Sequence, residues 1–84
     1  MAEITLTKHA IAAASRRQIT EKTIWEAING PDHIFPDPKD AELQWYVKKI
    51  DGRCLVIIVK EETGQFKCIT VFYDRRLQRR GLCT

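Results

Sequence analysis

The stretch from Leu43 to Tyr73 constrains the fold of this chain more than any other part of it. Three runs rich in β-branched and aromatic residues are separated there by two short turn signals, Asp51-Gly52 and residues 61–64. Such runs favour β-strands, and an Asp-Gly pair is typical of the two-residue type I′ hairpin turn, which needs positive φ angles. We therefore expect a three-stranded antiparallel meander over this stretch.

The two turns predict how the strands pair. The Asp-Gly turn pairs Ile50 with Arg53, and a second loop of four residues pairs Lys60 with Gln65. Because side chains alternate along a strand, this register assigns every residue of the meander to one face of the sheet. Both faces are largely apolar, so we expect both to be at least partly covered. Three polar residues share one face in this register: Tyr46, Lys48 and Thr70.

The chain before the meander predicts one strand and two helices. Residues 3–7 alternate in polarity, which indicates a short strand. Helices are expected from residue 8 to about residue 17 and over residues 21–29, each preceded by a threonine that can cap it. A proline-rich connection follows, with a brief edge strand at residues 33–35. The expected fold class is α+β, with two N-terminal helices packed on a twisted antiparallel sheet of about four strands.

The length of 84 residues allows one domain, which we place at residues 1–74, followed by a basic C-terminal tail at residues 75–84. The N-terminus lacks the basic and apolar regions of a secretory signal, and the longest apolar run, residues 54–59, is far too short to span a membrane. We therefore expect a cytoplasmic protein without membrane contact.

The cysteine count bears on disulfides and metals. Three cysteines, an odd number, argue against a disulfide framework. The expected register places Cys54 and Cys68 on opposite sheet faces, where they cannot bond to each other, and Cys83 falls in a frayed tail. No Cys-x-x-Cys pair occurs, and neither His9 nor His33 has ligand-like spacing to the cysteines. We expect no metal and no other cofactor.

The net charge of +3 is carried by the end of the chain. Residues 74–80 hold four of the arginines, and without this segment the positive excess disappears. These arginines are Arg75, Arg76, Arg79 and Arg80. Two interpretations stay open: a solvated basic tail, or an arm that attracts the phosphates of a nucleic acid.

A second cluster of candidate residues lies on the first helix. Four residues fall within one arc of the expected helix: His9, Ala13, Arg16 and Arg17. The two guanidiniums could hold a phosphate while His9 transfers a proton near neutral pH. Alternatively, His9 bonds the backbone near the helix start and packs on its neighbours. The polar residues of the sheet have a similar alternative, in which their stems pack and their polar ends reach water at the sheet rim.

Several segments together resemble a known family. They are Ile-Thr-Leu-Thr-Lys-His-Ala, an arginine eight residues after that histidine, Ile-Thr-Glu-Lys-Thr-Ile-Trp-Glu-Ala-Ile-Asn-Gly-Pro-Asp, Tyr-Val-Lys-Lys-Ile-Asp-Gly-Arg-Cys-Leu-Val-Ile-Ile-Val and Ile-Thr-Val-Phe-Tyr. Over about residues 4–73 this pattern is similar to the small bacterial family called domain of unknown function 4258. That family in turn resembles the RelE/ParE and barnase-like group, in which many members are metal-independent ribonucleases and toxins of toxin–antitoxin pairs.

The resemblance implies a set of site residues. The recurring polar positions of the family correspond here to His9, Arg17, Tyr46, Lys48 and Thr70. In an RNA-cleaving site His9 would act as base or acid, while Arg17, Arg16 and Lys48 would hold the phosphate. Tyr46 or Tyr73 could stack a base or donate a proton, and the arginines of the tail would add attraction that does not depend on RNA sequence.

Three functions follow as expectations. The resemblance predicts a metal-independent endoribonuclease, the toxin of a toxin–antitoxin pair, with RNA and an antitoxin protein as partners. The alternative is a non-catalytic module that binds RNA or protein through the same basic surface. The third is a small interaction subunit that forms a homodimer through an edge strand. The family usually has arginine where Ala13 stands and glycine where Gln18 stands, and the missing arginine favours the binding module.

Overall fold

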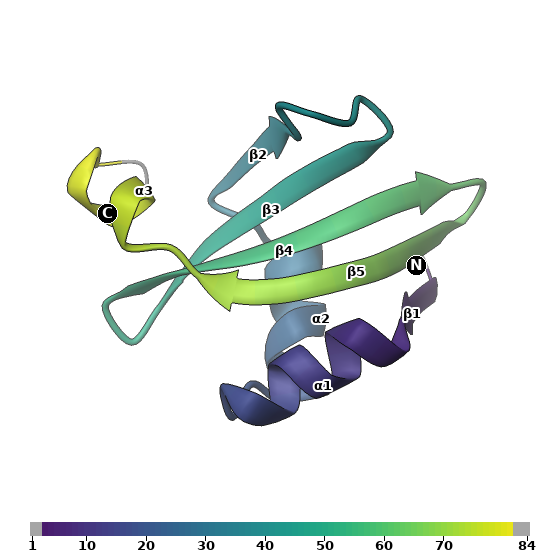
Figure 1. The fold of residues 1–84 in the computed structure, drawn as a ribbon, viewed down its shortest axis with the longest axis horizontal. Helices are drawn as coiled ribbons and strands as arrows, with labels where there is room; N and C mark the ends of the chain where they lie inside the picture. Colours follow the sequence, from purple (N-terminus) through teal and green to yellow (C-terminus); the bar gives the residue numbers. More distant parts are fainter. Residues whose placement is uncertain (1–2, 82–84) are drawn as a thin grey trace.

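The computed structural model describes residues 3–81 and places a five-stranded sheet between a layer of two helices and one short helix (Figure 1). The elements in chain order are β1 (Glu3–Leu6), α1 (Lys8–Arg16), α2 (Glu21–Asn29), β2 (His33–Pro36), β3 (Leu43–Ile50), β4 (Arg53–Glu62), β5 (Gln65–Tyr73) and α3 (Arg75–Arg79). The expected α+β class is confirmed, although the described residues form three helices instead of two.

The order of the strands in the sheet is β1-β5-β4-β3-β2. The pairs β2–β3, β3–β4 and β4–β5 are antiparallel, and β2 is the edge strand expected after the second helix. Strand β1 lies parallel to β5, with Ile4 opposite Phe66, so the sheet is mixed and has five strands instead of about four. The alternating residues of β1 indicate a strand but not its partner, which lies at the far end of the chain.

The two N-terminal helices begin where their threonine caps predict. The Thr7 hydroxyl accepts a hydrogen bond from the Ala10 N–H at 3.1 Å, and the Thr20 hydroxyl accepts one from the Thr23 N–H at 3.2 Å. Such caps satisfy N–H groups that have no partner within the helix. Helix α1 packs on β5 through small side chains. The buried residues of α1 are Ala10, Ala13 and Ala14.

The first hairpin has the expected register, with Ile50 opposite Arg53 across the Asp-Gly turn. The second hairpin does not. Glu62 pairs with Gln65, so the strands are joined by a two-residue turn in which Gly64 has a φ of 72°. The prediction of a four-residue loop was therefore wrong, because Glu61 and Glu62, which were expected in the loop, extend β4.

A β-bulge changes the faces of the second half of β5. Val59 pairs with Cys68, but Ile58 pairs with Thr70, so Ile69 is an extra residue opposite the break. From there on, the side chains of β5 lie on the faces opposite to those expected. Thr70 shares the face of Ile58, away from α1 and α2, while Val71 is fully buried in the core beneath those helices.

The sheet has apolar side chains packed on both faces, as expected. The larger core lies between the sheet and helices α1 and α2. A smaller cluster on the other face is made by Val47, Cys54, Val56 and Leu77, and Leu77 comes from α3. Helix α3 thus covers part of this second face (Figure 1).

The two described cysteines lie in different cores, as the register predicts. Cys68 is free and buried beneath the helices, and this burial raises the pKa of its thiol to about 11. Cys54 belongs to the other cluster and takes part in a disulfide, which the odd cysteine count does not predict. Cys83, expected in a frayed tail, lies outside the described residues.

No helix within residues 3–81 is long and apolar enough to cross a membrane. Over the same residues, no three His, Cys, Asp or Glu side chains come together in a way that could hold a metal ion.

Candidate nucleic-acid interface

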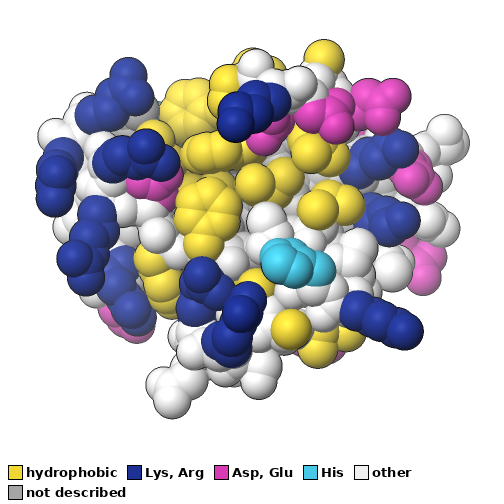
Figure 2. All heavy atoms as spheres, viewed as in Figure 1, with side chains coloured by type: hydrophobic (Ala, Val, Ile, Leu, Met, Phe, Trp, Pro, Cys, Tyr) yellow, Lys and Arg dark blue, Asp and Glu magenta, His cyan; other side chains and the backbone are white. Residues whose placement is uncertain are grey.

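The seven arginines of the chain lie in three segments that are far apart in the sequence. Arg16 and Arg17 end α1, Arg53 begins β4, and the others lie in or directly after α3. Arg17, Arg53 and Arg75 line one common pocket, so the fold brings the three segments together. Figure 2 shows many of the Lys and Arg side chains gathered at the left, where Figure 1 places α3 and the β3–β4 turn. We call the surface of these seven residues the arginine end.

Helix α3 packs against the rest of the fold, although the sequence predicts a basic tail at these residues. The carboxylate of Asp74 accepts hydrogen bonds from the N–H groups of Arg76 and Leu77 at 2.8 and 3.3 Å, which caps the helix. The Asp74 N–H donates to the Cys54 carbonyl at 2.9 Å. Gln78 donates from Nε2 to the Gly52 carbonyl at 2.8 Å, so α3 is tied to the first hairpin at both of its ends.

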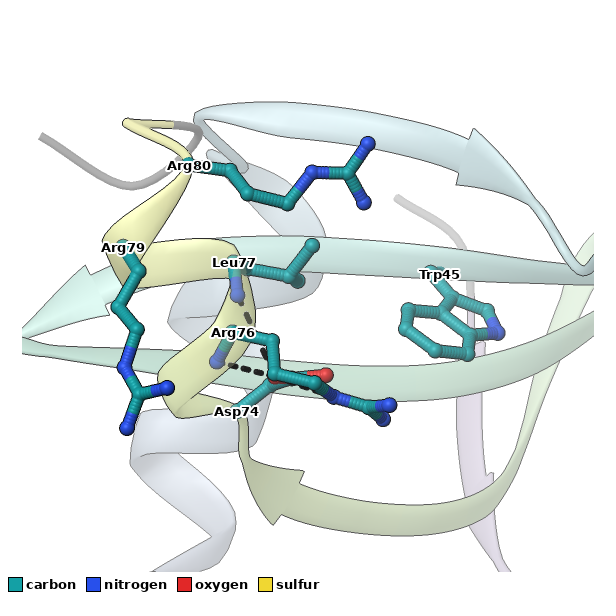
Figure 3. A pocket seen from close by; sticks show the side chains of 6 residues that line it. All are labelled: Trp45, Asp74, Arg76, Leu77, Arg79 and Arg80. Carbon is teal, nitrogen blue, oxygen red and sulfur yellow. Dashed lines mark hydrogen bonds and ion pairs between the residues drawn. The ribbon is translucent and has the colours of Figure 1, made fainter.

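A pocket of about 420 Å³ lies between α3 and β3. Its lining consists of Trp45, Asp74, Arg76, Leu77, Arg79 and Arg80. In Figure 3, Arg76 and Arg80 extend from α3 along either side of the space in front of the Trp45 indole, whereas Arg79 points away from it. We call this space the Trp45 pocket. It combines one aromatic ring with positive charge on both sides.

The position of the Trp45 indole is fixed by a hydrogen bond and by a contact with another ring. Its Nε1–H donates to the Asp37 carboxylate at 2.8 Å, and its ring meets Phe72 edge-on with centroids 5.7 Å apart. The hydrogen bond from Trp45, together with backbone N–H donors at Lys39 and Asp40, lowers the pKa of Asp37 below its ordinary value. A ring fixed in this way loses little conformational entropy when another ring stacks on it.

A second pocket, of about 280 Å³, shares Asp74 with the Trp45 pocket. Its lining consists of Arg17, Arg53, Cys54, Tyr73, Asp74, Arg75 and Gln78. The Arg53 guanidinium lies over the Tyr73 ring, 4.0 Å from its centroid, and Arg17 donates from Nη1 to the Ala13 carbonyl at 3.3 Å. We call this space the three-arginine pocket.

The five residues that the resemblance implies as catalytic are not brought together. Tyr46 is 5% exposed in the helix-side core, and its hydroxyl donates to the Glu61 carboxylate. Burial, and then the Glu61 carboxylate, raise the pKa of Tyr46 well above its usual value. Lys48 donates to the Gly30 carbonyl at 2.8 Å, which ties it to the end of α2, and Thr70 lies on the opposite face of the sheet.

His9 is exposed near the start of α1, and it lines neither pocket. It lies eight residues before Arg17, which places the two Cα atoms about 12 Å apart along the helix axis. Between them on the expected arc, Ala13 is 1% exposed and packs in the core. Of the five residues, only Arg17 contributes to a pocket at the arginine end.

Sequence reasoning missed Arg53 and Trp45 as site residues. Arg53 could have been found from the meander, because β5 runs antiparallel to β4 and therefore ends near the start of β4, with Tyr73 opposite Leu55. The basic segment that follows β5 must then begin near Arg53. Trp45 had no such signal, because its exposure depends on how far α3 covers the second face of the sheet.

Comparisons with known proteins give a family. A family model described as Domain of unknown function (DUF4258) matches residues 6–73, which is most of the chain. No curated protein and no solved structure matches the chain significantly.

Proposed function

We propose that this chain, which belongs to the DUF4258 family of domains of unknown function, binds RNA through its arginine end and does not cleave it. The observation that carries the proposal is the gathering of arginines from α1, β4 and α3 around one end of the sheet, next to the ring of Trp45.

The arginines supply the attraction to the RNA backbone. Guanidinium groups bind phosphate oxygens through pairs of parallel hydrogen bonds and stay charged at any physiological pH. The side chain of Arg76 is 85% exposed, and its Nε lies 3.8 Å from Asp74, so most of its donors face solvent. Several such contacts along a strand give sequence-independent affinity, with the release of bound counterions.

Trp45 favours a single strand over a duplex. Every base has a π-face, so an aromatic ring beside cationic side chains is a common platform for unpaired nucleotides. Arg76 and Arg80 extend on either side of the ring, where they can reach the phosphates that flank a stacked base (Figure 3). RNA is recognised mostly in single-stranded regions, whose bases are free to stack in this way.

Binding without cleavage fits the geometry better than the ribonuclease that the resemblance implies. Cleavage needs a proton-transfer group within hydrogen-bond reach of the held phosphate. His9 lies about 12 Å along α1 from Arg17. The hydroxyl of Tyr46 is buried and already donates to Glu61. The antitoxin partner, the homodimer and the RelE-like kinship stay predictions.

The test measures affinity and cleavage in the same samples. A short single-stranded RNA is titrated with protein in the presence of a chelator, and its fluorescence anisotropy is recorded. Arg76→Gln with Arg80→Gln should weaken binding by at least about tenfold. Lys60→Gln with Lys67→Gln removes the same charge near the β4–β5 turn, at the other end of the sheet, and should change affinity little.

The RNA is then run on a denaturing gel. Intact RNA in every sample is the expected result. Cleavage by the wild type that disappears in His9→Ala would instead establish the ribonuclease. An equal loss of affinity in the arginine and lysine variants would reject a binding surface at the arginine end.

A further inference from the structure

The sheet face opposite α1 and α2 carries a row of aromatic rings. Phe35 of β2 pairs directly with Trp45 of β3, so the two side chains lie on the same face. Phe72 of β5 meets the Trp45 ring edge-on, and all three rings pack against the cluster that includes Leu77. The three rings are only partly buried, because α3 covers only part of this face (Figure 1). The row therefore extends from the Trp45 pocket to the edge strand β2.

A third pocket, of about 320 Å³, lies beside the Trp45 pocket at this edge of the sheet. The two pockets meet at three side chains that line both of them, those of Trp45, Leu77 and Arg80. The other lining residues of the third pocket are Phe35, Pro36 and Pro38. We call this space the Phe35 pocket. Its volume lies within the range of about 300–1,000 Å³ that is common for small-molecule sites.

The Phe35 pocket is apolar apart from one cationic side chain. Among the side chains that line it, only those of Arg80 and Trp45 have hydrogen-bonding groups, and the indole N–H already donates to Asp37. The remaining walls are aromatic, proline and leucine side chains. A ligand that fits this lining has a flat apolar body next to a negative charge. A nucleotide has this composition, because its base offers a π-face and its phosphate is an anion.

The walls of the Phe35 pocket are fixed before a ligand arrives. The His33 ring stacks on Phe35, with centroids 5.7 Å apart and planes 19° apart, and His33 does not line the pocket. The prolines on either side of Asp37 have a fixed φ, and the Asp37 carboxylate holds the Trp45 indole. Fixed walls reduce the entropy that is lost when a ligand binds.

We propose that the Phe35 pocket binds a second nucleobase, the neighbour in the RNA strand of the base that stacks on Trp45. The proposal rests on the proposed function and extends it to a path of two adjacent bases across the open sheet face. Aromatic residues of a sheet bind single-stranded RNA in this way in other folds. Because Arg80 lines both pockets, it can contact the phosphate that links the two nucleotides. The lining offers few groups that read base edges, so we expect little dependence on RNA sequence.

The first measurement removes the Phe35 ring and keeps an apolar side chain in its place. In Phe35→Leu the affinity for a short oligoadenylate should fall by about five- to tenfold, which is typical for the loss of one base–aromatic contact. The slope of log K against log salt concentration should equal that of the wild type, because Phe35 contacts a base and no phosphate. Trp25→Leu is the matched control, because it removes a 43% exposed ring from α2, and it should change neither quantity.

The second measurement locates the bases on the wild-type protein. A short RNA that contains 4-thiouridine is irradiated in the complex, and the crosslinked residues are identified by mass spectrometry. We expect crosslinks at both Trp45 and Phe35. Since this experiment needs no substitution, it decides the question even if Phe35→Leu proves unstable in urea denaturation.

The outcomes separate this inference from the proposed function. Wild-type affinity in a folded Phe35→Leu, or crosslinks at Trp45 without any at Phe35, would overturn the second base site and leave RNA binding in place. A flatter salt slope in Phe35→Leu would mean that the pocket holds a phosphate and not a base, which also contradicts the inference. No binding of RNA by the wild type would overturn both proposals.

Discussion

Neighbouring side chains in this protein have very different roles because the backbone turns them to different environments. Trp45 and Tyr46 are adjacent in β3, yet Tyr46 is sealed beneath the helices while Trp45 lines a pocket on the other face. Both are fixed by a carboxylate, Asp37 for the indole and Glu61 for the phenol. The same kind of hydrogen bond therefore supports the core in one case and a binding surface in the other.

Removing the Tyr46 hydroxyl should lower stability without affecting RNA binding. In Tyr46→Phe the ring still packs in the core, but the bond to Glu61 is lost, and Glu61 is exposed and regains water. We expect the free energy of unfolding to fall by about 1 kcal/mol. Urea denaturation measures this, with Glu62→Gln as a control that removes a neighbouring charge and not the bond. A loss of RNA affinity at unchanged stability would show that Tyr46 belongs to the site.

The raised pKa of Tyr46 predicts a loss of stability in alkali. In the unfolded chain a tyrosine releases its proton near pH 10, whereas the native state keeps it because burial and Glu61 disfavour the phenolate. Above about pH 10 the unfolded state therefore binds fewer protons, and stability falls as pH rises. Denaturation midpoints at pH 9 to 11 should fall more steeply for the wild type than for Tyr46→Phe, where this contribution is absent. Parallel slopes would contradict this explanation.

Gln18 adopts a backbone conformation that favours glycine. Its φ is 56°, directly after the C-cap residue Arg17, and left-handed geometry costs a residue with a Cβ about 1 kcal/mol. The family that the sequence resembles usually has glycine at this position. Gln18→Gly should therefore raise the free energy of unfolding by about 0.5–1 kcal/mol. Thermal denaturation checks this against Gln18→Ala, which keeps the Cβ. A decrease in both variants would mean that the Gln18 side chain itself stabilises the fold.

At the scale of elements, two short features determine where the candidate site lies. The bulge in β5 leaves Thr70 on the face opposite Tyr46, which separates two residues of the implied catalytic set. Helix α3, only five residues long, is held by its cap at Asp74 and by the burial of Leu77. The arginines of α3 therefore have defined positions relative to Trp45 and Arg53.

Substitutions of Asp74 test whether RNA affinity depends on the position of α3 or only on the local charge. Asp74→Ala removes a negative charge from the arginine end but also removes the cap, at a cost of about 1 kcal/mol in helix stability. We expect RNA affinity to fall several-fold in Asp74→Ala and to rise in Asp74→Asn, which keeps an acceptor oxygen without the charge. Anisotropy titrations measure both. A similar rise in the two variants would indicate that only charge matters and that the position of α3 does not.

At the scale of the whole molecule, charge is distributed unevenly between the two ends of the sheet. The arginines line the pockets around α3, whereas most of the acidic side chains visible in Figure 2 lie toward the other end, around the β2–β3 connection and the β4–β5 turn. Such an arrangement orients an approaching polyanion before any specific contact forms. The net charge of +3 is modest, but the positive charge is concentrated at the arginine end and gives a stronger field there.

The salt dependence of RNA binding should report the arginine end directly. For single strands, each phosphate contact contributes about −0.7 to the slope of log K against log salt concentration. Arg76→Gln with Arg80→Gln should reduce the magnitude of the slope by about 1.4, whereas the Lys60 and Lys67 pair should leave it unchanged. Titrations at several salt concentrations give the slopes. An unchanged slope in the arginine variant would mean that these two residues do not contact phosphates.

Local sequence signals predicted most of the secondary structure. Threonine caps, the Asp-Gly turn and runs of β-branched residues predicted both N-terminal helices, the first hairpin and the edge strand close to where they occur. These features depend on the backbone preferences of a few consecutive residues, so the chain specifies them without reference to the rest of the fold. The positive charge of residues 74–80 was equally visible, because composition alone reveals it.

The assembly of the site depended on contacts between distant residues. No local sequence pattern predicts that β1 pairs with β5 in parallel or that Ile69 forms a bulge. Nor does one predict that Asp74 caps a helix that packs on the sheet face opposite α1 and α2. Each of these results from side chains competing for burial within a small core, and the winning arrangement is a property of the whole packed molecule. The pocket of Arg17, Arg53 and Arg75 exists only because three remote segments meet at one end of the sheet.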